Sequence, residues 1–294
     1  MSFNEGIQID PGRASGGGGG RGGIAIGGGL GGIAVLILAL VFGVNPNDLL
    51  GGGSQAPAPA QTNQFAHCTG GQAANQYVDC RIIATAESLD AVWGQLLPKY
   101  GQQYTKPGLR IFNQVTNTGC GQATSDVGPF YCPVDQTAYF DTSFFQVLVD
   151  QFGSSGGPLA QEYVVAHEFG HHIQDELGIL GRSQQDPQGA QSASVRTELM
   201  ADCLAGVWAH YASTVPDPQS GLPFLKPLTQ NDIRDALSAA AAVGDDRIQR
   251  TVQGRVNPEA FTHGTSAQRQ HWFSTGYQTG DLNACNTFAA RDLG

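Results

Sequence analysis

The stretch that decides the fold of this chain is LAQEYVVAHEFGHHIQ, residues 159–174. Apolar side chains recur in it at the spacing of one helix face, and Pro158 suits a first helical turn. His167 and His171 are four residues apart, so they lie on the same face of that helix. We therefore expect a helix over residues 159–177 that presents two imidazoles side by side.

The spacing of the two histidines is that of a zinc site. Two imidazoles one turn apart can bind one Zn²⁺ from the same side, and Glu168 then projects beside the metal as a general base. The alternative is a pair of capping or surface histidines on an ordinary helix. Gly170 costs such a helix about 1 kcal/mol relative to Ala. We therefore expect another backbone to pack closely against it.

A catalytic zinc needs a third protein ligand and an open fourth position. Residues 194–209, SVRTELMADCLAGVWA, also have helical periodicity. Within them, Glu198 is the expected third ligand. Asp202, one turn further on, can accept the Nδ1–H of a zinc-bound imidazole and fix its tautomer. Two carboxylates on one face can also mean a solvated surface, but this helix is otherwise apolar.

Other third ligands have weaker support in the sequence. A metzincin site needs Gly and His at fixed positions after the motif, and this chain has Gln174 and Leu177 there. His210, His263 and His271 remain possible ligands, although none has an acidic partner at helical spacing. His172 is expected to have a packing role.

The segment HEFGHHIQ (167–174), followed by ELMADCLAG (198–206), resembles the family of bacterial "putative neutral zinc metallopeptidases". These are Glu-zincin-like, membrane-anchored proteins. YCPVDQTAYFDTSFF (131–145) and FTHGTSAQRQHWFSTGY (261–277) are also similar, so the resemblance extends over roughly residues 65–290. It implies a Zn²⁺ cofactor and a peptide or protein substrate, and it says little about which peptide.

The expected reaction is hydrolysis of a peptide bond by a metal-activated water. Glu168 would act as the general base, and His263 is the candidate donor to the oxyanion, with Arg269 and Tyr277 behind it. His263 could instead stabilise its loop. Two further functions stay open, namely a non-catalytic membrane-tethered scaffold with a structural zinc, and another zinc hydrolase that acts on amides.

The rest of the body is expected to be an α+β, zincin-like domain with a small sheet packed against a predominantly helical body. Strands are expected at 109–115 and 138–141, the second either as an edge strand that a peptide could extend or as an ordinary core strand. The polar segment 178–193 is expected to be a loop that could gate the site. Helices are expected at residues 86–100, 142–152, 159–177, 195–212, 229–242 and 264–279.

The first 64 residues differ in composition from the body. Residues 22–44 carry no charge and, at about 1.5 Å per residue, are long enough to cross a bilayer. We expect disorder over 1–21, a single transmembrane helix over 22–44, a flexible linker over 45–64 and the metallopeptidase domain over 65–294. Arginines before the span predict a cell-membrane protein with an extracytoplasmic body. A cleaved signal peptide is the alternative.

Charge and cysteine content restrict the partners and the compartment. The net charge is -10 and there is no basic tract, which argues against nucleic acid as a partner. All six cysteines follow the linker, and their spacing suggests three disulfides although fifteen connectivities exist. Free buried thiols are the alternative. The sequence carries no indication of oligomeric state. The suggested pairs are Cys68–Cys80, Cys120–Cys132 and Cys203–Cys285.

Overall fold

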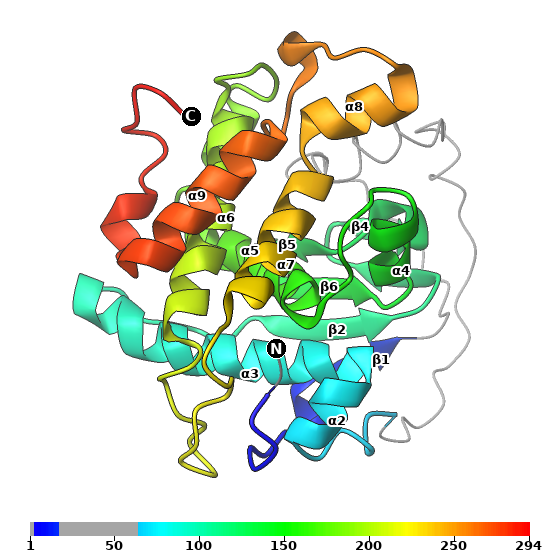
Figure 1. The fold of residues 1–294 in the computed structure, drawn as a ribbon, viewed down its shortest axis with the longest axis vertical. Coiled ribbons are helices and arrows are strands. Elements are labelled where there is room, and N and C mark those ends of the chain that lie inside the picture. The colour runs from blue at the N-terminus through cyan, green and yellow to red at the C-terminus, as the bar shows by residue number, and fades with distance from the viewer. Residues whose placement is uncertain (1–2, 18–63) are drawn as a thin grey trace.

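The computed structural model describes residues 3–17 and 64–294 of the chain. Figure 1 shows a small sheet beside a larger group of helices, so the fold is α+β. The architecture of a small sheet and a helical body matches the expectation from the sequence.

The main sheet has four strands in the order β1-β2-β6-β5. Strands β1, β2 and β6 are parallel, and β5 pairs with β6 in the antiparallel sense. Of the two alternatives for residues 138–141, the edge strand is wrong and the core strand is confirmed, because β5 covers the outer side of β6. A separate hairpin joins β3 and β4. The strands are β1 (Ser15–Gly17), β2 (Gly108–Phe112), β3 (Val115–Thr118), β4 (Gly121–Thr124), β5 (Phe130–Cys132) and β6 (Thr137–Asp141).

The helices confirm the expected ones in their main parts, with two additions. The first addition lies before residue 86 and consists of α2 and the first turns of α3. The second addition is α8. The α-helices are α2 (Gly71–Gln76), α3 (Val78–Leu96), α4 (Phe144–Asp150), α5 (Pro158–Glu176), α6 (Ala193–Tyr211), α7 (Gln230–Ala242), α8 (Asp245–Gln253) and α9 (Ser266–Thr279). The 3-10 helices are η1 (Pro11–Arg13), η3 (Leu97–Tyr100), η4 (Ser125–Val127), η5 (Leu180–Gln184), η6 (Pro258–Ala260) and η7 (Leu282–Cys285).

Glycines let α5 and α9 approach α6 closely. A Cβ added to Gly170 on α5 would lie 2.9 Å from the carbonyl oxygen of Ala201. A Cβ added to Gly276 on α9 would lie 1.9 Å from the carbonyl oxygen of Cys203. The close backbone neighbour expected at Gly170 is therefore confirmed as α6. This packing holds the helices that carry the candidate ligands at short range.

Three disulfides stabilise the body, and they are the pairs that the cysteine spacing suggested. Cys203–Cys285 ties η7 to the middle of α6 across 82 residues, whereas the other two pairs close short loops. One of these short loops ends at Cys132 in β5, so the edge strand of the sheet is covalently fixed. Among the described residues no cysteine is free.

Residues 3–17 form part of the body, so the expectation of disorder over 1–21 is wrong for them. Phe3, Ile7 and Ile9 are buried, and β1 adds a parallel strand to β2. Arg13 forms an ion pair with Asp90 of α3, with 2.8 Å between Nε and Oδ2. The segment is ordered because these apolar side chains bury enough surface to hold it on the body, which its Gly and Ser residues alone could not do.

The predicted membrane topology is also wrong. A single crossing between residues 17 and 64 would place β1 and β2 on opposite sides of a bilayer, yet these strands are paired. Within the two described ranges, none of the helices has the length and apolar character needed to span a membrane. The predicted span 22–44, and the linker up to residue 63, lie outside the described residues. The extracytoplasmic placement of the body, which depended on that span, loses its basis.

Candidate metal centre and active-site cavity

Three of the predicted site residues meet between α5 and α6. Nε2 of His167 lies 3.2 Å from Oε2 of Glu198, and Nε2 of His171 lies 3.4 Å from Oε1 of the same carboxylate. Zn–N and Zn–O bonds of about 2.0–2.2 Å place the ligand atoms of a tetrahedral site roughly 3.3–3.5 Å apart. The separations and the N/O donor set therefore fit one zinc ion.

Local sequence explains why these side chains converge. His167 and His171 are one turn apart on α5, with their ring centroids 4.8 Å apart. α6 begins at a capped end, where the hydroxyl of Ser192 accepts a hydrogen bond from the backbone N–H of Val195. The close approach at Gly170 then brings Glu198 across to the two imidazoles.

Each imidazole has a hydrogen-bond partner on its other nitrogen. Nδ1 of His167 lies 2.9 Å from Oδ1 of Asp202, as the helical spacing predicted. Nδ1 of His171 lies 2.9 Å from Oε1 of Gln174, and the amide of Gln174 donates to the carbonyl of Thr197 at 2.6 Å. These contacts leave both Nε2 atoms directed at the candidate metal position. Sequence reasoning missed Gln174, although its place three residues after His171 was a usable signal.

A buried arginine on α9 completes the surroundings of Asp202. Arg269 pairs with Oδ2 of Asp202 through Nε at 2.8 Å and with Oδ1 through Nη2 at 2.9 Å. The hydroxyl of Tyr163 also donates to Asp202, and Nη1 of Arg269 donates to the carbonyl of Val243 at 3.3 Å. The cation holds the buried Asp202 ionised, although burial alone would raise its pKa.

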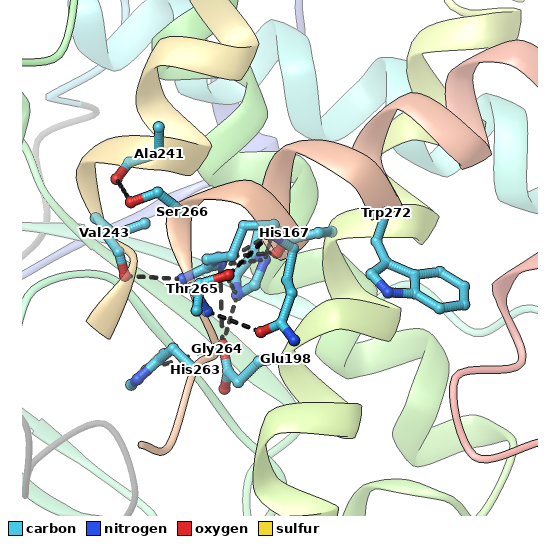
Figure 2. A network of polar contacts seen from close by, with 12 residues as sticks. His167, Glu198, Ala241, Val243, His263, Gly264, Thr265, Ser266 and Trp272 are labelled. Carbon is cyan, nitrogen blue, oxygen red and sulfur yellow. Dashed lines mark hydrogen bonds and ion pairs between the residues drawn. The ribbon is translucent and has the colours of Figure 1, made fainter. Parts of the chain in front are cut away.

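His263 lies in the loop before α9, and Figure 2 shows this loop beside His167 and Glu198. Its Nε2 is 3.8 Å from Oε2 of Glu198. The loop is fixed by Asp245, whose Oδ2 accepts backbone hydrogen bonds at 2.6–2.9 Å from three consecutive residues, Thr262, His263 and Gly264. The position next to the candidate metal suits a donor to substrate, which keeps the predicted role of His263 open.

Burial changes the pKa values of the group before any metal binds. Burial raises the pKa of Glu168, and the neighbouring His167 and His171 partly offset this effect. Burial would lower the pKa of His167, but Asp202 and Glu198 raise it to about 9. Burial would raise the pKa of Glu198, but the facing histidines hold it well below its usual range. A metal ion would therefore displace a proton that His167 holds at neutral pH.

The group opens into a cavity of about 300 Å³. Glu168, one residue after the first ligand, lines this cavity together with both histidines and Glu198. Its walls also include Phe130 and Tyr131 of the edge strand β5, and Ser183 and Gln184 of η5. The predicted loop 178–193 thus contributes a short 3-10 helix to the cavity wall.

The other histidines lie in different surroundings. Nδ1 of His210 contacts the backbone carbonyl of Tyr277 at 2.8 Å, and the His271 ring packs on Trp272. Neither belongs to the group of side chains that could hold a metal at this site. His172 is buried, 3.1 Å from the hydroxyl of Tyr131, in agreement with the expected packing role.

Comparison with known proteins agrees with this geometry. A family model described as "Putative neutral zinc metallopeptidase" matches residues 3–288. The chain is 59% identical over 261 residues to the uncharacterized protein Rv2575 of Mycobacterium tuberculosis (strain ATCC 25618 / H37Rv), covering 87% of each chain. It is 43% identical over 265 residues to the uncharacterized protein YpfJ of Escherichia coli (strain K12), covering 88% of this chain and 87% of that one. No solved structure matches the chain.

Proposed function

Because the chain belongs to the family of putative neutral zinc metallopeptidases, we propose that it hydrolyses peptide bonds at the site formed by α5 and α6. The observation that supports this proposal is a set of three candidate ligands with an additional carboxylate, Glu168, facing the cavity. Structural zinc sites are usually closed by four protein ligands. Among the described residues the group offers three, which favours catalysis over a scaffold.

His167, His171 and Glu198 would hold the zinc. When bound, the ion supplies a water of lowered pKa and a Lewis acid for the substrate carbonyl. Glu168 takes a proton from the attacking water on its carboxylate and passes it to the leaving nitrogen. Its raised pKa suits this role, because burial favours the protonated form that delivers the proton.

The remaining residues position these groups. Asp202 fixes the ring of His167 through Nδ1, and Gln174 does the same for His171. His263 donates a hydrogen bond to the oxyanion from the side of Glu198. Among the described residues, the sheet ends on one side at β5, two of whose side chains line the cavity, so an extended peptide would bind by pairing with that strand.

The test compares the parent protein with Glu168→Gln, and the same substitution at the exposed Glu259 serves as the matched control. Metal content is measured by elemental analysis, and hydrolysis is measured on an unfolded polypeptide. We expect about one zinc per chain in all three proteins and a loss of at least 10³-fold in kcat for Glu168→Gln alone. Equal hydrolysis by the parent and Glu168→Gln would remove Glu168 from the mechanism. Zinc binding without hydrolysis in the parent would favour the scaffold.

A further inference from the structure

The active-site cavity has two chemically different ends along one face of α5. Val164, Glu168, His171 and Asp175 are spaced by four, three and four residues, so they share that face. All four line the cavity. The candidate metal group lies in the middle, with Val164 one turn before it and Asp175 one turn after it. A peptide that crosses the group along α5 would therefore meet both ends.

The end at Val164 is apolar. The apolar side chains of Phe144, Phe152, Val243 and Ile248 line the same cavity. Val243 is linked to this part of α5 through Arg269, which donates to its carbonyl and to the hydroxyl of Tyr163. The side chain of Arg247 anchors α8 to the segment after α4 by donating to the carbonyl of Gly153 at 3.3 Å. The guanidinium of Arg247 is thus engaged with backbone. Arg269 also lines the cavity beside Val243, but its guanidinium is paired with Asp202.

The end at Asp175 is polar and acidic. Tyr131 donates to Oδ2 of Asp175 at 2.9 Å. The 3-10 helix η5, which follows α5, lines the cavity with Ser183 and Gln184 and with the apolar Leu180. Within residues 3–17 and 64–294, the other oxygen, Oδ1, has no hydrogen-bond partner. The nearest cation along the chain, Arg182, stacks on the ring of Phe288 with its guanidinium carbon 5.1 Å from the centroid. In the part of the chain that the structure describes, no Arg or Lys forms an ion pair with Asp175.

Val164 and Asp175 are eleven residues apart on α5, which is about 16–17 Å at about 1.5 Å per residue, or the length of about five residues of an extended peptide. At about 1.5 Å per residue, Val164 lies about 5 Å before His167, and Asp175 lies about 6 Å beyond His171. Side chains on one side of an extended peptide repeat every 6.6–6.8 Å or so. A peptide paired with β5 could thus place one side chain at each end while its carbonyl lies at the metal group.

We infer that the cavity selects peptides with a large apolar side chain on one side of the scissile bond and a lysine or arginine on the other. The inference rests on the proposed peptidase function. The apolar end recognises its side chain by burial of hydrocarbon, worth about 25 cal/mol per Å². Asp175 recognises the cationic side chain by a charge-assisted hydrogen bond.

The test is the cleavage profile of a random peptide library, read by mass spectrometry. For the parent protein we expect Lys or Arg to be enriched at least tenfold on one side of the cleaved bond and Phe, Leu or Ile on the other. Asp175→Asn should abolish the first preference and keep the second. Asp175→Lys should replace it by a preference for Asp or Glu. Ile248→Ala should weaken the apolar preference several-fold and keep the basic one.

Matched controls separate the site from general effects. Asp150→Asn lies at the exposed end of α4, and Val252→Ala lies on the exposed face of α8, so both should retain the parent profile. Zinc content near one per chain verifies that each variant is folded. An active parent with no preference, or with one that Asp175→Asn leaves intact, overturns the inference and leaves the peptidase function standing. A zinc-loaded parent without any cleavage overturns both.

Discussion

Asp202 lies 2.9 Å from Nδ1 of His167 while the same carboxylate is paired in bidentate fashion with Arg269. All three side chains are buried. A buried carboxylate needs a partner for its charge, and here a cation provides it. Because Arg269 keeps Asp202 ionised, the carboxylate can accept the Nδ1–H of His167 and fix the orientation of the ring without becoming protonated itself.

This relationship predicts the effect of removing the cation. Arg269→Met should lower the affinity for zinc by about 10–100-fold, because Asp202 would then be buried with one fewer partner and would orient His167 less well. Arg269→Lys should restore part of the affinity. Competition with a chromogenic chelator measures the change. Arg250→Met, at an exposed position of α8, is the control, and an unchanged affinity in Arg269→Met would show that Arg269 does not support the site.

A second prediction concerns His263. His263→Asn should reduce kcat by about 10²–10³-fold, the loss seen when one oxyanion donor is removed. KM and zinc content should stay close to those of the parent, since Asp245 fixes the loop through backbone hydrogen bonds that the substitution leaves in place. Steady-state kinetics on a peptide substrate check this expectation. A loss of zinc instead would make His263 a metal ligand.

The close approach of α9 to α6 gives a stability prediction. Gly276→Ala should lower the free energy of unfolding by about 1–3 kcal/mol or more, since its Cβ would lie 1.9 Å from the Cys203 carbonyl oxygen. Gly94→Ala is the matched control in a helix interior, where the added Cβ would lie 4.0 Å from Cδ1 of Tyr104. It should raise stability by about 0.5–1 kcal/mol. Urea unfolding of both variants decides the point.

Glu162 predicts a pH dependence of stability. It is fully buried on α5, and neither carboxylate oxygen has a hydrogen-bond partner among the described residues. Burial raises its pKa from 4.5 to about 8, although Arg81 opposes the shift. The folded protein therefore keeps this proton while the unfolded chain releases it. The contribution of Glu162 to stability is complete below pH 4.5 and is lost as the pH rises towards 8.

The variant Glu162→Gln should remove that dependence. Its stability relative to the parent should rise by up to about 1.4 kcal/mol per pH unit through this window and level off above it. Urea unfolding from pH 5 to pH 9 measures the difference, with Glu259→Gln as an exposed control. A constant difference across the range would mean that Glu162 is ionised in the folded protein.

Much of the candidate centre follows from local sequence. His167, His171, Glu198 and Asp202 are each separated by one helical turn from a partner on the same helix, so periodicity alone relates them. The structure adds the crossing of the two helices at Gly170, which the cost of a helical glycine already suggested. Whether these residues bind zinc remains a prediction that metal analysis tests.

The long-range partners could not be deduced in the same way. Arg269 is 67 residues from Asp202, and no pattern within α9 indicates which carboxylate it meets. Asp245 organises the His263 loop from 18 residues away, across a turn whose path the sequence does not specify. The sequence left the choice between an edge strand and a core strand at residues 138–141 open for a related reason, because the pairing order of short strands depends on contacts that lie outside each strand.

The pairing of β1 with β2 joins two parts of the fold that are far apart in the sequence. Residues 3–17 and 64–294 form one fold although 18–63 separate them, and Phe3 exchanges hydrogen bonds with the side chain of Asn75. A break anywhere in the intervening stretch would consequently leave two fragments with complementary surfaces. A synthetic peptide of residues 1–17 should reassociate with a truncated chain that starts at residue 64, as in fragment complementation.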